Sequence, residues 1–229
     1  MKNIKVIETG DGSSTLYNES LNETYHSSHG AVTESLHVFL KSGLEDIAEK
    51  TKAIRILEIG FGTGLNAILT IQKALTMPDH HIHYTSLETF PLSKEIVEGL
   101  NYKSMLPEEL HGYFDQIHNA PWNEAVDILP NFTLKKVNEG LETFELEEED
   151  NPFNLYYYDA FAPNKQPELW EVERFQKCYD MAEEGALLVT YCAQGQFRRN
   201  LKAAGFTMEK WPGPPGKREM TRGHKIGRC

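Results

Sequence analysis

The 229-residue sequence has few cysteines and no long apolar run. Its three cysteines, Cys178, Cys192 and Cys229, are scattered, without a C-x-x-C pair or a histidine at ligand spacing. This distribution argues against a disulfide scaffold and a structural zinc site. No apolar segment has the length of a membrane span or the position of a signal peptide. We therefore expect a cytoplasmic protein without a membrane partner or a bound metal.

Positive charge is also scarce, since the net charge is −11, and this balance argues against a nucleic-acid partner. The charge is distributed unevenly, however. Acidic residues cluster between positions 142 and 150, whereas the segment after position 197 is basic and contains only two acids, Glu209 and Glu219. A local basic region on an acidic protein can still hold phosphates. The alternative is an ordinary solvated surface.

The length suits one sizeable α/β domain. Candidate strands and helices alternate through most of the chain, and the last two strands are joined by a G-P-P-G turn. This order predicts a doubly wound parallel sheet whose last strand runs antiparallel. We expect a single domain over residues 1–229, with a hairpin and helical extension at 1–50 and a Rossmann-like core at 51–229.

Smaller features near the start and middle of the chain give further expectations. Residues 4–17 are predicted to form two strands around a turn at 9–12. His26 and His29 follow in the segment Y-H-S-S-H-G. Because no third ligand is near, we expect this segment to cap a cofactor cleft rather than to bind a metal. Residues 111–123 have mixed signals and are predicted to be irregular.

A glycine-rich turn is the most informative stretch of the sequence. Residues 54–59 form a short apolar run that suits a buried parallel strand, and a helical stripe begins at Leu65. Gly60, Gly62 and Gly64 lie between them. Strand, glycine-rich turn and helix is the arrangement that brings bare backbone amides and a helix N-terminus against a nucleotide-like ligand.

An acid inside the preceding strand narrows the interpretation of this turn. Glu58 is costly to desolvate unless something binds it. The third glycine comes one residue earlier than in the dinucleotide fingerprint G-x-G-x-x-G. The pattern E-x-G-x-G-x-G resembles motif I of the class I S-adenosylmethionine-dependent methyltransferases. The resemblance implies that Glu58, the three glycines and Asn66 bind this cofactor, Glu58 at its amino-acid end. An ordinary tight turn is the alternative.

Polar residues follow the next two predicted strands. The strand at 82–88 ends on Glu88, roughly where a ribose-binding carboxylate is expected. A surface acid that caps the following helix is the alternative. After the strand at 132–137, the family resemblance places an acid that contacts adenine. This sequence has Asn138 and Glu139 there instead of the usual Gly-Asp pair, and either could substitute.

Asp159 follows an apolar-aromatic strand at 153–158, at the sheet edge where α/β folds bind ligands. With Phe161 and Pro163 it forms a looser relative of the D/N-P-P-Y/F motif of amino-methylating enzymes. An alkylamine with a pKa of roughly 10 is protonated at neutral pH and cannot attack a methyl group. A carboxylate beside it can accept its proton. We expect Asp159 to be catalytic and Phe161 and Pro163 to bind substrate; a helix N-cap is the alternative for Asp159.

The chain as a whole resembles the methyltransferase module of the MnmC-type proteins, which modify the wobble uridine of tRNA. The segments that carry the resemblance are 24–31, 58–66, 87–92, 159–170, 197–206 and 216–220. It implies a class I methyltransferase fold and transfer of a methyl group from S-adenosylmethionine to the amine of 5-aminomethyl-(2-thio)uridine. It also implies the tRNA anticodon stem-loop as a partner, held largely through phosphates. Lys217 and Arg218 are the residues that we expect to reach it.

One departure from the better-known members concerns the substrate. Those proteins fuse the module to a flavin-dependent oxidoreductase, whereas this sequence has no second glycine fingerprint. We expect no flavin and no oxidase activity, and another enzyme that supplies the aminomethyluridine. Two alternatives stay open. The acidic charge would suit a methyltransferase or aminopropyltransferase acting on a small amine, and the missing Gly-Asp pair would suit an inactive fold that only binds RNA.

Overall fold

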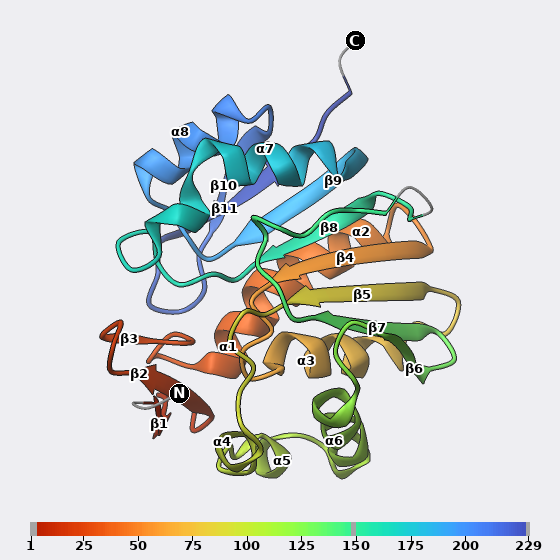
Figure 1. Ribbon diagram of the computed structural model, residues 1–229, viewed down its shortest axis with the longest axis vertical. Helices are drawn as coiled ribbons and strands as arrows, with labels where there is room; N and C mark the ends of the chain where they lie inside the picture. The colour runs from red at the N-terminus through yellow and green to blue at the C-terminus, as the bar shows by residue number, and fades with distance from the viewer. Residues whose placement is uncertain (1–3, 148–149, 228–229) are drawn as a thin grey trace.

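The central sheet has eight strands in the part of the chain that the computed structural model describes, residues 4–147 and 150–227. These strands are β4 (Ala53–Ile59), β5 (His81–Leu87), β6 (Ala125–Leu129), β7 (Phe132–Val137), β8 (Phe153–Tyr158), β9 (Ala182–Thr190), β10 (Thr207–Pro212) and β11 (Glu219–His224). Their order is β10-β11-β9-β8-β4-β5-β7-β6 (Figure 1). Glu148 and Glu149 of the acidic stretch, together with Arg228 and Cys229, lie outside the described residues.

The strand order reverses at β4. This strand pairs in parallel with β5 on one side and with β8 on the other. β7 continues the sheet beyond β5, and β9 continues it beyond β8, both in parallel. The carboxyl ends of these strands therefore meet at one edge, which is where doubly wound sheets bind ligands. β11 pairs antiparallel with β9 and β10, which confirms the predicted doubly wound sheet with an antiparallel C-terminal hairpin.

The sheet is buried on both faces. All six residues of β8 are buried, as expected of a parallel strand with helices on either side. Because successive side chains point to opposite faces, Leu155 and Tyr157 pack into one apolar cluster while Tyr156 and Tyr158 pack into the other.

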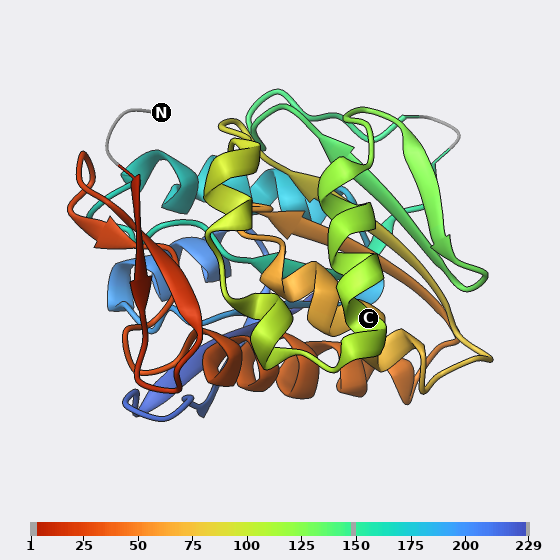
Figure 2. The ribbon, with the colours of Figure 1, turned by 90° about the horizontal axis from the view of Figure 1, so that it is seen from below.

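Helices cover the two faces (Figures 1 and 2). The first cluster includes residues of α1 (Ala31–Ser35), the π-helical stretch η1 (Leu36–Leu44), α2 (Glu45–Ala48), α3 (Leu65–Ala74), α5 (Tyr102–Met105), the 3-10 turn η2 (Glu108–Leu110) and α6 (His111–Asn119). The second includes residues of the 3-10 turn η3 (Pro167–Trp170), α7 (Val172–Asp180) and α8 (Gly195–Ala203). α4 (Lys94–Glu98) has no fully buried residue. No helix among the described residues is long and apolar enough to cross a bilayer.

The prediction that residues 111–123 are irregular is wrong, because α6 begins at His111. Phe114 and Ile117 bury one side of this helix. Gly112, which is a poor helix former, and the polar residues on the other side weaken the helical pattern in the sequence.

Two further differences concern the boundaries of elements. The apolar helical pattern over residues 168–181 suggests one helix, but the backbone is extended at Glu171, with φ −80° and ψ 160°, so the turn η3 precedes α7. β6 has no predicted counterpart. It pairs antiparallel with β7 at the edge of the sheet, with a register shift between Asp127 and Leu129.

A separate three-stranded antiparallel sheet precedes the core. It consists of β1 (Ile4–Glu8), β2 (Ser14–Asn18) and β3 (Glu23–Thr24), which confirms the hairpin predicted around residues 9–12. Asp11 in its turn accepts hydrogen bonds from the Ser13 and Thr33 backbone N–H groups at 3.1 and 2.9 Å, and so ties the turn to α1. The small sheet lies beside the carboxyl ends of the central strands (Figures 1 and 2).

Candidate active site

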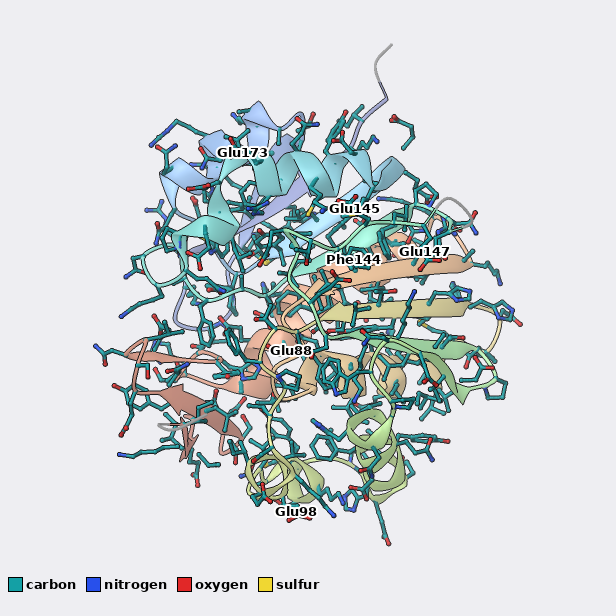
Figure 3. The ribbon with its side chains drawn as sticks, viewed as in Figure 1. Glu88, Glu98, Phe144, Glu145, Glu147 and Glu173 are labelled. Atoms are coloured by element: carbon teal, nitrogen blue, oxygen red, sulfur yellow. The ribbon has the colours of Figure 1, made fainter. Side chains whose placement is uncertain are left out.

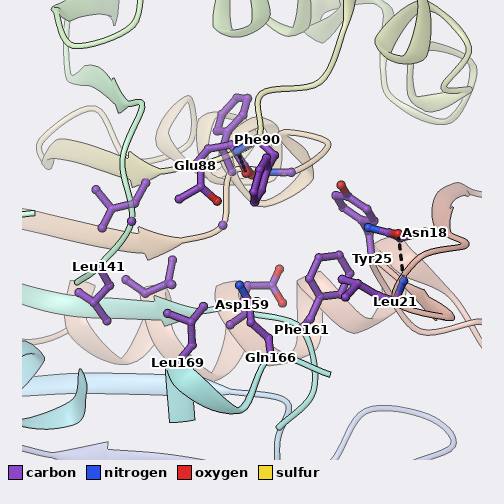
Figure 4. A pocket seen from close by; sticks show the side chains of 18 of the residues that line it. Asn18, Leu21, Tyr25, Glu88, Phe90, Leu141, Asp159, Phe161, Gln166 and Leu169 are labelled. Carbon is purple, nitrogen blue, oxygen red and sulfur yellow. Dashed lines mark hydrogen bonds between the residues drawn. The ribbon is translucent and has the colours of Figure 1, made fainter. Parts of the chain in front are cut away.

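A cavity of about 540 Å³ opens at the carboxyl ends of β4, β5 and β8. Its walls come from the glycine turn, the ends of β5 and β8, the segment after β7 and the small N-terminal sheet. Its volume lies within the roughly 300–1,000 Å³ of small-molecule sites. Figure 4 shows Glu88 and Asp159 approaching the cavity from different strands, with the rings of Tyr25 and Phe161 beside one another.

The glycine turn forms the base of the cavity. Gly60, Gly62 and Gly64 all have positive φ, at 97°, 49° and 72°, a region that side chains other than glycine rarely enter. A Cβ atom on Gly62 would lie only 3.2 Å from Tyr25 Cδ1. The turn thus presents bare backbone to the cavity, and any side chain at Gly62 would compete with the aromatic wall for space.

Glu88 is anchored to this turn. Its Oε2 accepts a hydrogen bond from the Gly62 N–H at 2.9 Å, and its Oε1 accepts one from the Phe90 N–H at 2.8 Å. Burial raises the pKa of Glu88, while these backbone donors oppose the rise. Each carboxylate oxygen keeps a second lone pair, so Glu88 can still accept hydrogen bonds from a ligand in the cavity.

Glu58 lies beneath the turn rather than on its surface. It is 1% exposed, and its two oxygens accept hydrogen bonds from Asn66 Nδ2 at 3.1 Å and Ser86 Oγ at 2.6 Å. Burial, aided by the charge of Asp159, raises the pKa of Glu58 to about 8. Its direct contacts are therefore with the protein, and it can act on a ligand through Asn66.

Asn66 joins the two acids that the sequence singles out. Its Nδ2 donates to Glu58 Oε1 and, at 2.9 Å, to Asp159 Oδ2. This fixes the orientation of the amide, because a flipped side chain would place its oxygen against two carboxylates. Asn66 Oδ1 is buried and has no hydrogen-bond partner within the described residues, and the side chain lines the cavity. An acceptor is therefore presented to a ligand that carries N–H groups.

Asp159 is partly buried directly after β8. Burial, together with the negative charge of Glu34, raises the pKa of Asp159 to about 7, while the Asn66 amide and the Lys217 ammonium oppose the rise. A carboxyl group with a pKa near neutral is suited to accept and release a proton at physiological pH. The structure thus places a carboxyl group whose pKa is near neutral in the wall of a cavity of small-molecule size.

The substrate-binding residues predicted after Asp159 are placed differently from one another. Phe161 lines the cavity, and its ring meets that of Tyr25 edge to face with centroids 4.9 Å apart. Pro163 is half-buried in the same loop and is not among the lining residues. Lys165, two residues further, donates to the carbonyl oxygens of Leu21 and Asn22 at 2.9 and 3.0 Å. It fastens the loop to the N-terminal sheet.

Lys217 and Arg218 lie on the loop between β10 and β11. Lys217 Nζ donates to Glu34 Oε1 at 2.5 Å and lies 4.3 Å from the centroid of the Tyr191 ring. Its ammonium group is therefore engaged within the protein. Arg218 is exposed and is the more accessible of the two predicted tRNA contacts.

Four residues of the site or its surroundings received no role from the sequence, although three of them lie in segments that carry the family resemblance. Tyr25 and Phe90 line the cavity, and Phe90 is 65% exposed at its rim. Glu34 and Lys165 join segments that are far apart in the chain. The cap expected at His26 and His29 is present in part, since His26 lines the cavity.

Asn138 and Glu139, the two candidates for the adenine contact, take different positions after β7. Glu139 lines the cavity. Asn138 Nδ2 instead donates to the Glu88 carbonyl oxygen at 2.8 Å, and its N–H donates to Asn123 Oδ1 at 3.0 Å. Glu139 is therefore the better placed of the two to meet a ligand, and its role stays a prediction.

Known proteins similar to this chain agree with the architecture. A family model described as S-adenosyl-L-methionine-dependent methyltransferase matches residues 118–226. The crystal structure of MnmC2 from Aquifex aeolicus aligns with a TM-score of 0.80 at 26% identity, and covers 100% of this chain and 73% of that one. The chain has the class I S-adenosylmethionine-dependent methyltransferase fold.

Within that class the chain is similar to one group in particular. The tRNA 5-methylaminomethyl-2-thiouridine biosynthesis bifunctional protein MnmC of Cupriavidus metallidurans is 33% identical over 94% of this chain and 33% of its own length. The protein of the same name from Burkholderia mallei is 28% identical over 94% of this chain and 34% of its own length. The chain thus spans about a third of these relatives, and the predicted resemblance to the methyltransferase part of MnmC-type proteins is confirmed.

Proposed function

We propose that this protein transfers the methyl group of S-adenosylmethionine to the exocyclic amine of 5-aminomethyluridine, or of its 2-thio form, at the tRNA wobble position. The observation that carries the proposal is the Asp159 carboxylate, which Asn66 fixes beside the cavity and whose pKa is raised to about 7. The biosynthetic role named for the MnmC relatives supports the choice of a tRNA acceptor.

The residues around the cavity fit S-adenosylmethionine. The glycine turn leaves backbone against which a ligand can lie closely, and Glu88 can accept hydrogen bonds from both ribose hydroxyls. The unpartnered Asn66 Oδ1 can accept one from the ammonium group of the amino-acid end, with Glu58 holding the amide in place. When bound, the cofactor supplies an activated methyl group on a sulfonium sulfur.

The protein's own part in the transfer is to prepare the acceptor amine. An alkylammonium group cannot attack until it loses a proton. In its ionised form Asp159 can orient the ammonium group by a charge-assisted hydrogen bond and then accept that proton. The rings of Phe161 and Tyr25 form an apolar wall beside it, which limits the access of water. Proton removal and positioning are thus the work of one fixed carboxylate.

The tRNA is proposed to bind through its anticodon stem-loop, with phosphates facing the exposed loop between β10 and β11. Arg218 is the first candidate contact in this loop because its side chain is exposed. The aminomethyl group of the acceptor must come from a preceding reaction, which we assign to another enzyme. We place the reaction in the cytoplasm, where its tRNA substrate is found, and propose that it needs no flavin or metal.

The decisive experiment uses S-adenosylmethionine with an isotopically labelled methyl group. Incubation with tRNA that carries 5-aminomethyluridine should place the label on that nucleoside, as nucleoside digestion and mass spectrometry would show. Unmodified tRNA serves as the control and should stay unlabelled. Transfer only to protein or to small amines would refute the proposal, and failure to bind S-adenosylmethionine in calorimetry would instead favour an inactive RNA-binding fold.

A small-amine acceptor is the second candidate, and the net charge of −11 favours it. The variant Arg218→Glu distinguishes a tRNA acceptor from a small-amine acceptor. For a tRNA enzyme, we expect the reversal to weaken tRNA binding about tenfold at low salt and to lower the slope of log affinity against log salt by about one. The measurement is a salt titration of tRNA binding by fluorescence anisotropy.

The matched control for Arg218→Glu is Lys202→Glu. Lys202 is exposed near the carboxyl end of α8, while the amino end of that helix is the one that follows β9 at the ligand edge. This reversal changes the net charge equally and should alter tRNA binding little. Equal losses from both variants would indicate a nonspecific charge effect and would count against Arg218 as a tRNA contact.

A further inference from the structure

Glu34 and Lys217 form an ion pair that the proposed reaction does not use directly. Glu34 lies on α1 and is 6% exposed. Its Oε1 accepts from Lys217 Nζ at 2.5 Å, and its Oε2 accepts from the Ser27 N–H at 2.8 Å. Both oxygens of this buried carboxylate are thus occupied, and the Lys217 ammonium is held on the side of α1.

The pair lies close to the Asp159 site. The Lys217 ammonium rests against the face of the Tyr191 ring, 4.3 Å from its centroid. The hydroxyl group of the same ring donates to the carbonyl oxygen of Ala160 at 2.7 Å, and Ala160 directly follows Asp159. The Tyr191 ring therefore contacts both the ammonium group and the backbone of the residue that follows the proposed base. The charges of both Glu34 and Lys217 act on the Asp159 carboxyl group.

We infer that Glu34 is a positioning residue that holds the Lys217 ammonium away from Asp159, so that the carboxylate stays available to the acceptor amine. The inference rests on the proposed function for its meaning, since only a cationic acceptor would compete with Lys217 for the same carboxylate. It also assigns Lys217 a role inside the site, in place of a direct contact with tRNA phosphates.

Other ionisable groups around the pair cannot take over this role near neutral pH. The ionisable side chains coupled to Asp159 or Glu34 are Glu58 on β4, Tyr84 on β5, Tyr102 on α5, Tyr191 after β9 and His26 before α1, and Asp11 acts in turn on Tyr102 and His26. Burial raises the pKa of each of the three tyrosines and of Glu58, and it lowers the pKa of His26 to about 4. The tyrosines and His26 are therefore neutral at pH 7, and Asp11 is bonded within its own turn and to Thr33. Of the two charged side chains that act most directly on the Asp159 carboxyl group, Glu34 and Lys217, Lys217 is the cation.

The charges of the pair predict that the two single variants, Glu34→Gln and Lys217→Met, shift the pKa of Asp159 in opposite directions. In Glu34→Gln the amide keeps an oxygen for the Ser27 N–H and turns its NH₂ group toward Lys217. The ammonium group is then released toward Asp159, and an approaching cation lowers the pKa of a carboxyl group. In Lys217→Met the Glu34 carboxylate loses its counter-ion, and its uncompensated charge raises the pKa of Asp159.

The test is a titration of the Asp159 carboxyl carbon by NMR in the full chain, with the signal assigned through Asp159→Asn. We expect the pKa of Asp159 to fall by about one unit in Glu34→Gln and to rise by about one unit in Lys217→Met. The double variant should titrate close to the wild type, and Lys217→Arg, which can re-form the ion pair, should do so as well. Shifts of the same sign, or no shift in either single variant, would overturn the inference.

Kinetics provide a second readout. For methyl transfer at pH 7, Glu34→Gln should raise the KM for the tRNA acceptor about tenfold with a smaller change in kcat, because Lys217 competes with the amine for Asp159. Adding Lys217→Met should restore most of the loss. A purely structural role for Glu34 predicts instead that the double variant is no better than the single one.

Glu183→Gln is the matched control for these variants. Glu183 pairs with Arg55 near the amino end of β9, so its removal eliminates a comparable ion pair away from the ligand edge. It should leave the Asp159 titration and the KM unchanged. Wild-type protein that transfers no methyl group to tRNA would refute the proposed function, whereas the titration would still decide whether Glu34 controls the position of Lys217.

Discussion

Asp159→Asn is expected to lower kcat for methyl transfer to the tRNA amine by about 10²- to 10⁴-fold, the usual contribution of a positioned general base. The asparagine amide can occupy the same space but cannot accept the proton of the acceptor ammonium group. Asp159→Ala should have a similar effect, because the base is absent in both. The measurement is single-turnover transfer of a labelled methyl group.

Binding of S-adenosylmethionine provides the control for the Asp159 variants. Asp159 Oδ2 is bonded to Asn66, whereas the glycine turn and Glu88 are linked to each other by separate hydrogen bonds. Calorimetry should therefore give cofactor affinities within a few-fold of the wild type. Normal turnover in either variant would remove Asp159 from the mechanism, and lost cofactor binding would instead assign it a structural role.

The pH dependence of the wild type follows from the same group. Because the pKa of Asp159 is raised to about 7, the ionised form that accepts a proton is lost as the pH falls through that value. We expect kcat/KM for the acceptor to decline on the acid side of about pH 7, with a slope of one in the logarithmic plot. In Asp159→Asn the residual activity should lack this limb.

Glu88→Ala is expected to weaken S-adenosylmethionine binding by about 100-fold, since hydrogen bonds to a charged group contribute about 1.5–3 kcal/mol each. Two effects combine in this variant. The ribose loses its carboxylate acceptor, and the Gly62 and Phe90 N–H groups lose the oxygens that fix the turn. Isothermal titration calorimetry of the purified protein measures the change.

Glu98→Ala is the matched control for Glu88→Ala. Glu98 is exposed on α4, well away from Glu88 (Figure 3), and its removal changes the net charge equally. The affinity of the Glu98→Ala variant for S-adenosylmethionine should match that of the wild type. If Glu88→Ala also bound the cofactor normally, Glu88 would be a structural anchor of the turn and not a ligand of the ribose.

The features that could be predicted from the sequence are those in which a local pattern and a local cause coincide. The glycines at 60, 62 and 64 predict a tight turn, because the positive φ values that such a turn needs are rarely adopted by other residues. Glu88 and Asp159 each follow a recognisable buried strand, and parallel strands bring such residues to one edge. The doubly wound sheet and its C-terminal hairpin were predictable for the same reason.

What could not be predicted depends on contacts between distant segments. Motif I assigns Asn66 to the cofactor, but it does not indicate that the same amide bonds both Glu58 and Asp159, the latter 93 positions further along the chain. Glu34 and Lys217 are 183 positions apart, and no periodicity links them. The basic loop suggested two solvated cations to bind phosphates, because the sequence gives no sign of the buried acid on α1.

The attachment of the N-terminal sheet has a consequence for the rate at which the protein can turn over. One wall of the cavity belongs to a sheet that lies outside the central one, and Lys165 joins it to the Asp159 loop through two carbonyl oxygens. We expect a ligand of this cavity to be exchanged by opening of these two hydrogen bonds and the Tyr25–Phe161 contact, without any strand of the central sheet separating. Because such opening needs no global unfolding, we expect the rate of ligand exchange and the stability of the core to vary independently.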